Sequence, residues 1–138
     1  MRSILPILFL LTASAPVWSA DQNDQGLTVE LNTTQATADA CTLTFMVTNQ
    51  TSAPIEKAVF ETVLFGATGA VQSLTLFDFG ALPQMRPRVR QFAVPNLKCD
   101  DLSRILFNGA STCTAPDQAI CDAQLKPVSR VKTVEVLG

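Results

Sequence analysis

The 138-residue chain contains no histidine, and its six glycines are scattered singly along the sequence. Without histidine, a hydrolase triad lacks the base that usually works near neutral pH. The isolated glycines form no phosphate-binding loop, and the kinase-like triplet Asp78-Phe79-Gly80 stands without the other kinase motifs. Nucleotide chemistry is therefore excluded, and an enzyme with a non-histidine mechanism is the least favoured class of function.

Charge of either sign is also sparse. Ten basic and twelve acidic residues give a formal net charge of -2 with no run of like charge, which argues against a nucleic-acid partner. The chain has neither a C-x-x-C pair nor a regularly spaced acidic loop, so the patterns of structural zinc and calcium sites are absent. We interpret the acidic pairs Asp100/Asp101 and Asp117/Asp122 as solvated loop and cap positions. No metal or other cofactor is expected.

One long apolar segment is present, and it lies at the N-terminus. Arg2 supplies a positive start, an apolar run follows, and positions 12–20 are small and polar, which is the order of a secretory signal peptide. The apolar run is shorter than the roughly 18 to 20 residues that span a bilayer as a helix. We therefore predict a signal peptide at residues 1–20, cleaved after Ser19 or Ala20. The mature chain is expected to have no membrane span and to be periplasmic or secreted.

Residues 21–138, about 118 residues, match the usual size of a single domain. A short helix is predicted near 116–125, with Pro116 as its first residue and Asp117 in its first turn. Alternating apolar and polar residues between turn formers predict seven strands, at residues 26–32, 41–48, 55–65, 70–79, 89–94, 101–108 and 127–137. The predicted fold is all-β, a seven-stranded antiparallel sandwich of the immunoglobulin or fibronectin type.

The four cysteines are Cys41, Cys99, Cys113 and Cys121. In an exported chain they are most simply two disulfides, for which the sequence alone permits three pairings. In the sandwich topology the second and sixth strands run in the same sense in facing sheets, which favours Cys41 with Cys99. Cys113 would then pair with Cys121 around the short helix. A bond between Cys41 and Cys113 would join opposite ends of the sandwich and is less favoured.

The segment from Arg86 to Arg90 is the candidate partner-binding site. The alternation of a strand would place Arg86, Arg88 and Arg90 along one edge, where guanidinium groups can bind a carboxylate, a phosphate or an anionic protein surface. In the other interpretation, these charges and Pro87 keep an edge strand from pairing with other chains. Edge protection is the favoured interpretation, and binding remains open.

Two further groups of residues have alternative interpretations. Aromatic residues on strands of this size are mostly core, although a ligand cleft could be formed by Phe65, Phe77, Phe79 and Phe92. Two segments match the acceptor pattern for glycosylation, beginning at Asn32 and Asn49. That pattern has a meaning only in a eukaryotic source.

Residues 41–71, CTLTFMVTNQTSAPIEKAVFETVLFGATGAV, resemble bacterial immunoglobulin-like modules in which an asparagine-containing turn separates two strands. Together with LTLFDFGALP and RPRVRQF, they make the chain similar to a group of small, uncharacterised exported proteins of alphaproteobacteria. The resemblance implies a periplasmic location and an immunoglobulin-like fold. It implies no reaction and assigns no functional residue.

These observations favour an exported, non-enzymatic binding or accessory module of the cell envelope. It would contact a protein partner through a sheet edge or through the arginine segment. The alternative is a structural subunit or an inhibitor that acts by covering a partner.

Overall fold

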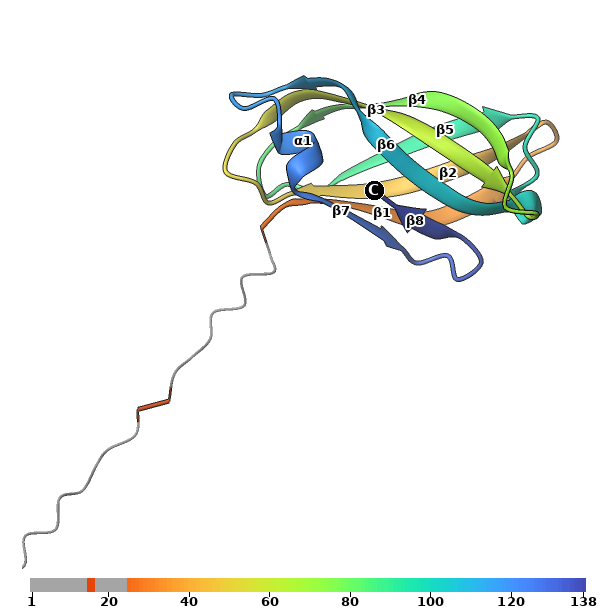
Figure 1. Cartoon of the computed structure of the whole chain (residues 1–138), viewed down its shortest axis with the longest axis horizontal. Helices are drawn as coiled ribbons and strands as arrows, with labels where there is room; N and C mark the ends of the chain where they lie inside the picture. The colour runs from red at the N-terminus through yellow and green to blue at the C-terminus, as the bar shows by residue number, and fades with distance from the viewer. Residues whose placement is uncertain (1–14, 17–24) are drawn as a thin grey trace, which may run out of the picture.

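The computed structural model describes residues 15–16 and 25–138. The predicted signal peptide therefore falls almost entirely outside the described residues, as do both predicted cleavage positions, Ser19 and Ala20. The elements in chain order (Figure 1) are β1 (Leu27–Ala36), β2 (Ala40–Asn49), β3 (Ile55–Gly66), β4 (Val71–Leu82), β5 (Arg88–Pro95), the 3-10 turn η2 (Cys99–Asp101), β6 (Leu102–Thr114), α1 (Ile120–Ala123), β7 (Leu125–Ser129) and β8 (Glu135–Leu137).

The strands form two four-stranded sheets. Sheet A has the order β5-β2-β1-β7, and sheet B has the order β4-β3-β6-β8. The two sheets lie face to face (Figure 1) and share one apolar core. The described part of the chain is therefore all-β, as expected, with a sandwich-like arrangement.

Phe45 of β2 lies at the centre of the core. Its ring contacts aromatic rings of both sheets at centroid distances of 5.7 to 6.0 Å, namely those of Phe77, Phe79, Phe92 and Phe107. The residues of β2 on the same face as Phe45 are also buried, whereas the intervening residues are half-buried on the outer face. The alternation of apolar and polar residues in β2 thus fixes which face of sheet A lies inward.

The predicted final strand at 127–137 is wrong, because the chain turns in the middle of it. β7 pairs in parallel with β1 in sheet A, whereas β8 pairs in parallel with β6 in sheet B. The structure therefore has eight strands rather than seven, and its sheets are not purely antiparallel. The turn has the sequence Arg-Val-Lys-Thr-Val, which contains no glycine, proline, asparagine or aspartate to mark it.

The predicted helix near 116–125 is reduced to the single turn of α1, Ile120–Ala123. The carboxylate of Asp117 accepts a hydrogen bond from the backbone N–H of Ala119 at 3.0 Å. Such a local side-chain bond competes with helical hydrogen bonding. The preceding residues therefore form bends and turns, and the helix starts only at Ile120.

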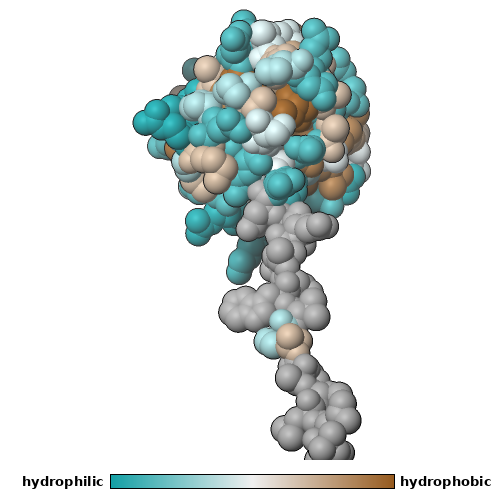
Figure 2. Space-filling model, turned by 90° about the vertical axis from the view of Figure 1, so that its left-hand side faces the viewer, coloured by the Kyte–Doolittle hydropathy of each residue, from teal (hydrophilic) through white to brown (hydrophobic). Residues whose placement is uncertain are grey.

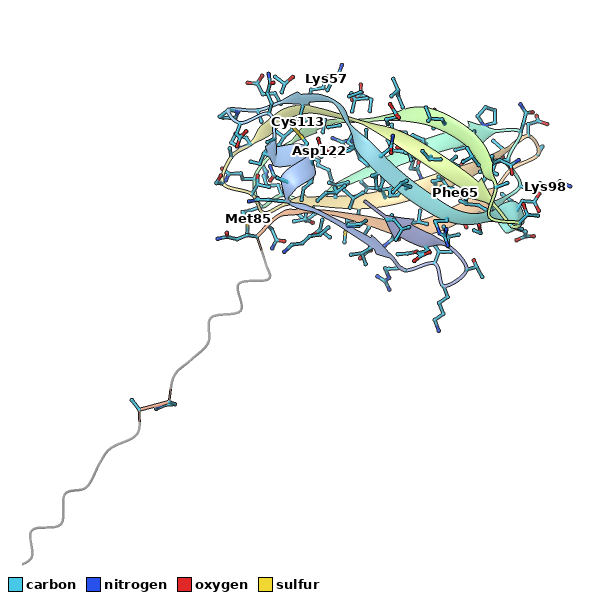
Figure 3. All side chains as sticks on the ribbon, in the orientation of Figure 1. Lys57, Phe65, Met85, Lys98, Cys113 and Asp122 are labelled. Atoms are coloured by element: carbon cyan, nitrogen blue, oxygen red, sulfur yellow. A yellow bond between two sulfur atoms is a disulfide. The ribbon has the colours of Figure 1, made fainter. Side chains whose placement is uncertain are left out.

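Two disulfides join the pairs expected from the strand order, Cys41–Cys99 and Cys113–Cys121. The first links β2 of sheet A to η2, which leads into β6 of sheet B. The second links the end of β6 to α1, and Figure 3 shows it beside Asp122. Cys41 and Cys121 are fully buried, so both bonds are continuous with the core.

The two disulfides should contribute unequally to stability, because they close loops of different length. Their sequence separations are 58 and 8 residues, for which chain entropy predicts about 4 and about 2.5 kcal/mol respectively. We expect Cys41→Ala/Cys99→Ala to lower the free energy of unfolding more than Cys113→Ala/Cys121→Ala does. Urea denaturation of the two variants tests this, and the reverse order would contradict it.

Candidate functional site

The three arginines of the predicted binding segment occupy different environments. Arg86 is exposed and precedes β5, so it is not part of the strand. Arg88 and Arg90 are half-buried and lie on the face of β5 that also carries Phe92 and the buried Val94. This face is turned toward sheet B, so the three guanidinium groups do not form one solvent-facing row.

Arg90 joins the neighbouring edges of the two sheets. Its Nε donates to the carbonyl oxygen of Phe79 at 2.7 Å, and its Nη2 donates to that of Ala81 at 3.1 Å. Both acceptors lie in β4, the edge strand of sheet B, whereas Arg90 lies in β5, the edge strand of sheet A. Its Nη1 donates to the carbonyl of Val89. All three nitrogens of Arg90 are therefore engaged by the backbone, and binding of a partner stays a prediction for Arg86 and Arg88.

The acidic pairs Asp100/Asp101 and Asp117/Asp122 lie in exposed turns or make local hydrogen bonds. Asp122 accepts a hydrogen bond from the backbone N–H of Ala110 at 2.8 Å, which holds α1 against β6. Asp117 caps the turn before α1, and Asp100 and Asp101 are exposed in η2. Within the described residues, no three or more cysteine, aspartate or glutamate side chains are grouped closely enough to hold a metal ion.

Asn49 is a buried structural residue with an exposed fraction of 1%. Its Nδ2 donates to the carbonyl oxygens of Ala53 and Leu82, and its Oδ1 accepts from the backbone N–H and hydroxyl of Thr51. Its side chain thus holds the turn between β2 and β3 and also ties the end of β2 to the end of β4. The nitrogen that glycosylation would modify is enclosed and already bonded.

Most of the aromatic residues considered for a cleft are packed in the core. Phe77 and Phe79 are buried, and Phe92 stacks on Phe77 with ring centroids 4.2 Å apart. Phe65 differs, because it lies on the outer face of sheet B with the guanidinium of Arg104 over its ring at 5.8 Å. Phe77, Phe79 and Phe92 are therefore core residues, whereas Phe65 is not.

A surface hollow of about 460 Å³ lies at the end of the molecule that carries Lys98 (Figure 3). It is formed by the β1–β2 turn and by residues 96–100, next to the Cys41–Cys99 disulfide. The charged side chains around it, Asp39, Lys98 and Asp100, are all exposed. A ligand site is expected to offer buried polar groups that orient the ligand, and this hollow offers none among its lining residues.

The opposite end of the molecule, which carries α1, is mainly hydrophilic, and Figure 2 shows only small apolar areas between its polar side chains. A hollow beside Cys113 is lined mostly by small polar residues such as Ser111, Thr112 and Thr114. This end of the molecule therefore presents no extended apolar surface.

The outer face of sheet B presents an extended apolar surface, which the sequence patterns did not identify. The strand register aligns Leu74 of β4, Val63 of β3, Leu106 of β6 and Leu137 of β8 in one row across all four strands. Three neighbouring side chains are among the most exposed apolar groups described: Val71 at 61%, Leu74 at 60% and Leu76 at 58%. The apolar residues of the sheet B outer face are Val59, Val63, Phe65, Val71, Leu74, Leu76, Leu106 and Leu137.

Charged and polar groups on this face are paired with one another. Arg104 Nε lies 2.8 Å from a carboxylate oxygen of Glu135, and Lys57 Nζ lies 3.5 Å from one of Asp78. Asn108 donates a hydrogen bond to Glu61 at 2.7 Å. Each of these pairs joins neighbouring strands, so the surface combines an apolar row with locally compensated charge.

The outer face of sheet A has a different character. Its central strand β2 presents threonines between the buried positions, and Thr44 accepts a hydrogen bond from Gln91 of β5 at 3.0 Å. The register sets Met46 between Val89 and Glu30, so its apolar groups are interrupted by charge. Only sheet B has an apolar outer face.

Comparison of the chain with protein-family models, with curated protein sequences and with solved structures finds no match. In the part of the chain that the structure describes, no helix has the length and apolar character needed to cross a membrane.

The contacts of Arg90 predict that the three arginines differ in their effect on stability. Arg90→Ala should lower the free energy of unfolding by about 1 to 2 kcal/mol, because two charge-assisted hydrogen bonds between the sheets are lost. Arg90→Lys should restore little of this, since one ammonium group cannot reproduce the fork of the guanidinium. The exposed Arg86→Ala is the control and should unfold like the parent protein in urea. If Arg90→Ala and Arg86→Ala changed the free energy of unfolding equally, the hydrogen bonds of Arg90 would not stabilise the contact between the two sheets.

Proposed function

We propose that this protein is an exported, non-enzymatic binding module with an immunoglobulin-like fold, which docks a protein partner of the cell envelope through the sheet B outer face. The observation that carries the proposal is the exposure of Val71, Leu74 and Leu76 beside a row of apolar side chains that crosses the whole sheet. Contiguous exposed apolar patches on a soluble domain mark interaction sites.

The shape of the surface favours a macromolecular partner over a small molecule. Val59 and Val63 are only 8% and 7% exposed, because longer neighbours on adjacent strands cover them. The result is a sheet surface on which these two valines are covered by neighbouring side chains, and the hollows at the two ends of the molecule are not lined by its apolar residues. Small ligands are bound in clefts, whereas protein interfaces combine an apolar centre with a polar surround. The ion pairs Arg104–Glu135 and Lys57–Asp78 supply that surround.

The sheet topology supports the immunoglobulin-like assignment. β2 and β6 lie in facing sheets, and the Cys41–Cys99 bond reaches from the start of β2 to the turn before β6. Immunoglobulin domains link their second and sixth strands in a similar way. There are eight strands instead of seven because the predicted last strand is divided into β7 of sheet A and β8 of sheet B.

The periplasmic location is supported by the predicted signal peptide and by the two disulfides, which persist in oxidising compartments. A structural subunit or an inhibitor that covers its partner would use the same apolar face, and either role fits the same geometry. Both roles depend on the sheet B outer face.

The two outer faces offer a matched pair of double variants. Leu76→Lys/Leu137→Lys places charge on sheet B at positions 58% and 37% exposed, and Val89→Lys/Val128→Lys places it on sheet A at positions 59% and 41% exposed. In affinity capture from envelope extract followed by mass spectrometry, we expect the sheet B variant to recover about tenfold less partner, because charge enters the apolar centre of the interface. The sheet A variant should recover as much as the parent protein.

Thermal unfolding of both variants verifies that each retains the fold. Recovery of the same partners by the parent protein and the sheet B variant would refute docking through this face. Loss of capture by the variants Arg86→Ala and Arg88→Ala, with the sheet B variant unaffected, would move the site to the arginine segment.

A further inference from the structure

The described strands leave four sheet edges, and three of them are protected. β5 carries Arg88 and Arg90, is preceded by Pro87 and ends at Pro95. β7 has five residues and contains Pro127, and β8 has three residues. Charges, prolines and short strands are the usual devices that stop an edge from pairing with another chain. β4 has twelve residues and lacks these devices from residue 71 to residue 77, where no charge and no proline occurs.

The free edge of β4 has definite limits. At its C-terminal end, Arg90 occupies the carbonyl oxygens of Phe79 and Ala81. The pairing with β3 skips Gln72 at one end and Phe79 at the other, so the regular part of the strand is residues 73–78. β4 therefore offers a short, uninterrupted strand edge whose outer side chains are Leu74, Leu76 and, at its end, Asp78.

We propose that this edge pairs in antiparallel fashion with the same edge of a second copy of the chain, with the two-fold axis at Thr75. Leu74 of each copy then lies opposite Leu76 of the other, on the outer face of the sheet. An antiparallel pair of identical strands forms a closed two-fold interface that uses the same surface on both copies. Sheet B would thereby extend into one continuous eight-stranded sheet.

The polarity of the facing side chains favours this register. A centre at Thr75 places Gln72 opposite Asp78, so no like charges face each other across the junction. A centre one residue earlier, at Leu74, would place Gln72 opposite Leu76 and so set a polar amide against an apolar side chain. The Thr75 register instead gathers four leucines, two from each copy, on the outer face.

The proposed pairing of two β4 edges does not depend on the proposed protein partner, but it would change the surface that such a partner meets. The two sheet B outer faces would become continuous across the junction, with Leu74 and Leu76 at its centre. Each dimer would then present a single apolar surface formed by both copies.

Sedimentation velocity of the mature, disulfide-bonded protein over a dilution series tests the proposal. The parent protein should show a reversible monomer–dimer equilibrium. Leu74→Lys/Leu76→Lys should weaken dimerisation by about tenfold or more, because four like charges would meet at the axis. Leu74→Lys/Leu76→Glu should dimerise at least tenfold more tightly than that variant, because each lysine then lies opposite a glutamate of the other copy. Val89→Lys, at an equally exposed position of β5, is the matched control and should dimerise like the parent.

Three results would overturn the proposal. These are a parent protein that stays monomeric up to about 1 mM, a double-lysine variant that dimerises as tightly as the parent, and a lysine–glutamate variant no tighter than the double-lysine variant. Circular dichroism before each run verifies folding. Because this test needs no partner, its failure leaves docking through the sheet B outer face standing, and a failed partner capture leaves the dimer standing.

Discussion

The packing of Phe45 against aromatic rings from both sheets is the interaction on which the rest of the structure depends. Phe45 comes from sheet A, whereas Phe77, Phe79 and Phe107 come from sheet B. Because side chains alternate along a strand, burying these rings determines which residues of every paired strand face outward. The outer residues of β2 are then mostly threonines, and those of β3 are mainly valine and phenylalanine. The difference between the two outer faces thus follows from the core.

An apolar outer face is not required for folding. Antiparallel sheets commonly alternate between a buried apolar face and a solvated polar face, and β2 does so. β3 instead has apolar groups on both faces, and its partner β4 adds Leu74 and Leu76 to the outer one. Arg90 protects only the far end of the β4 edge. The uncovered apolar surface and the unprotected strand edge therefore coincide on one side of the molecule, which is why we assign both to contacts with other chains.

The sequence was sufficient for the features that depend on local pattern. It predicted the strand at residues 41–48 and the all-β class, and the strand order led to Cys41 with Cys99. It failed where tertiary context decides: residues 130–134 turn without any turn-forming residue, because β7 and β8 pair with different sheets. Alternation predicted that Arg88 and Arg90 share one face of a strand. It did not predict that this face lies against β4. The sheet B outer face was not predicted, because it depends on the register of four strands.

The central claim is that the β4 edge is a contact surface between two copies of the chain, and amide hydrogen exchange along β4 tests it most directly. We expect the amides of residues 73–78 that are not hydrogen-bonded to β3 to exchange more slowly as the protein concentration rises, while those of β5 keep the same rates at every concentration. Concentration-independent exchange along β4, equal to that of an exposed edge, would contradict it.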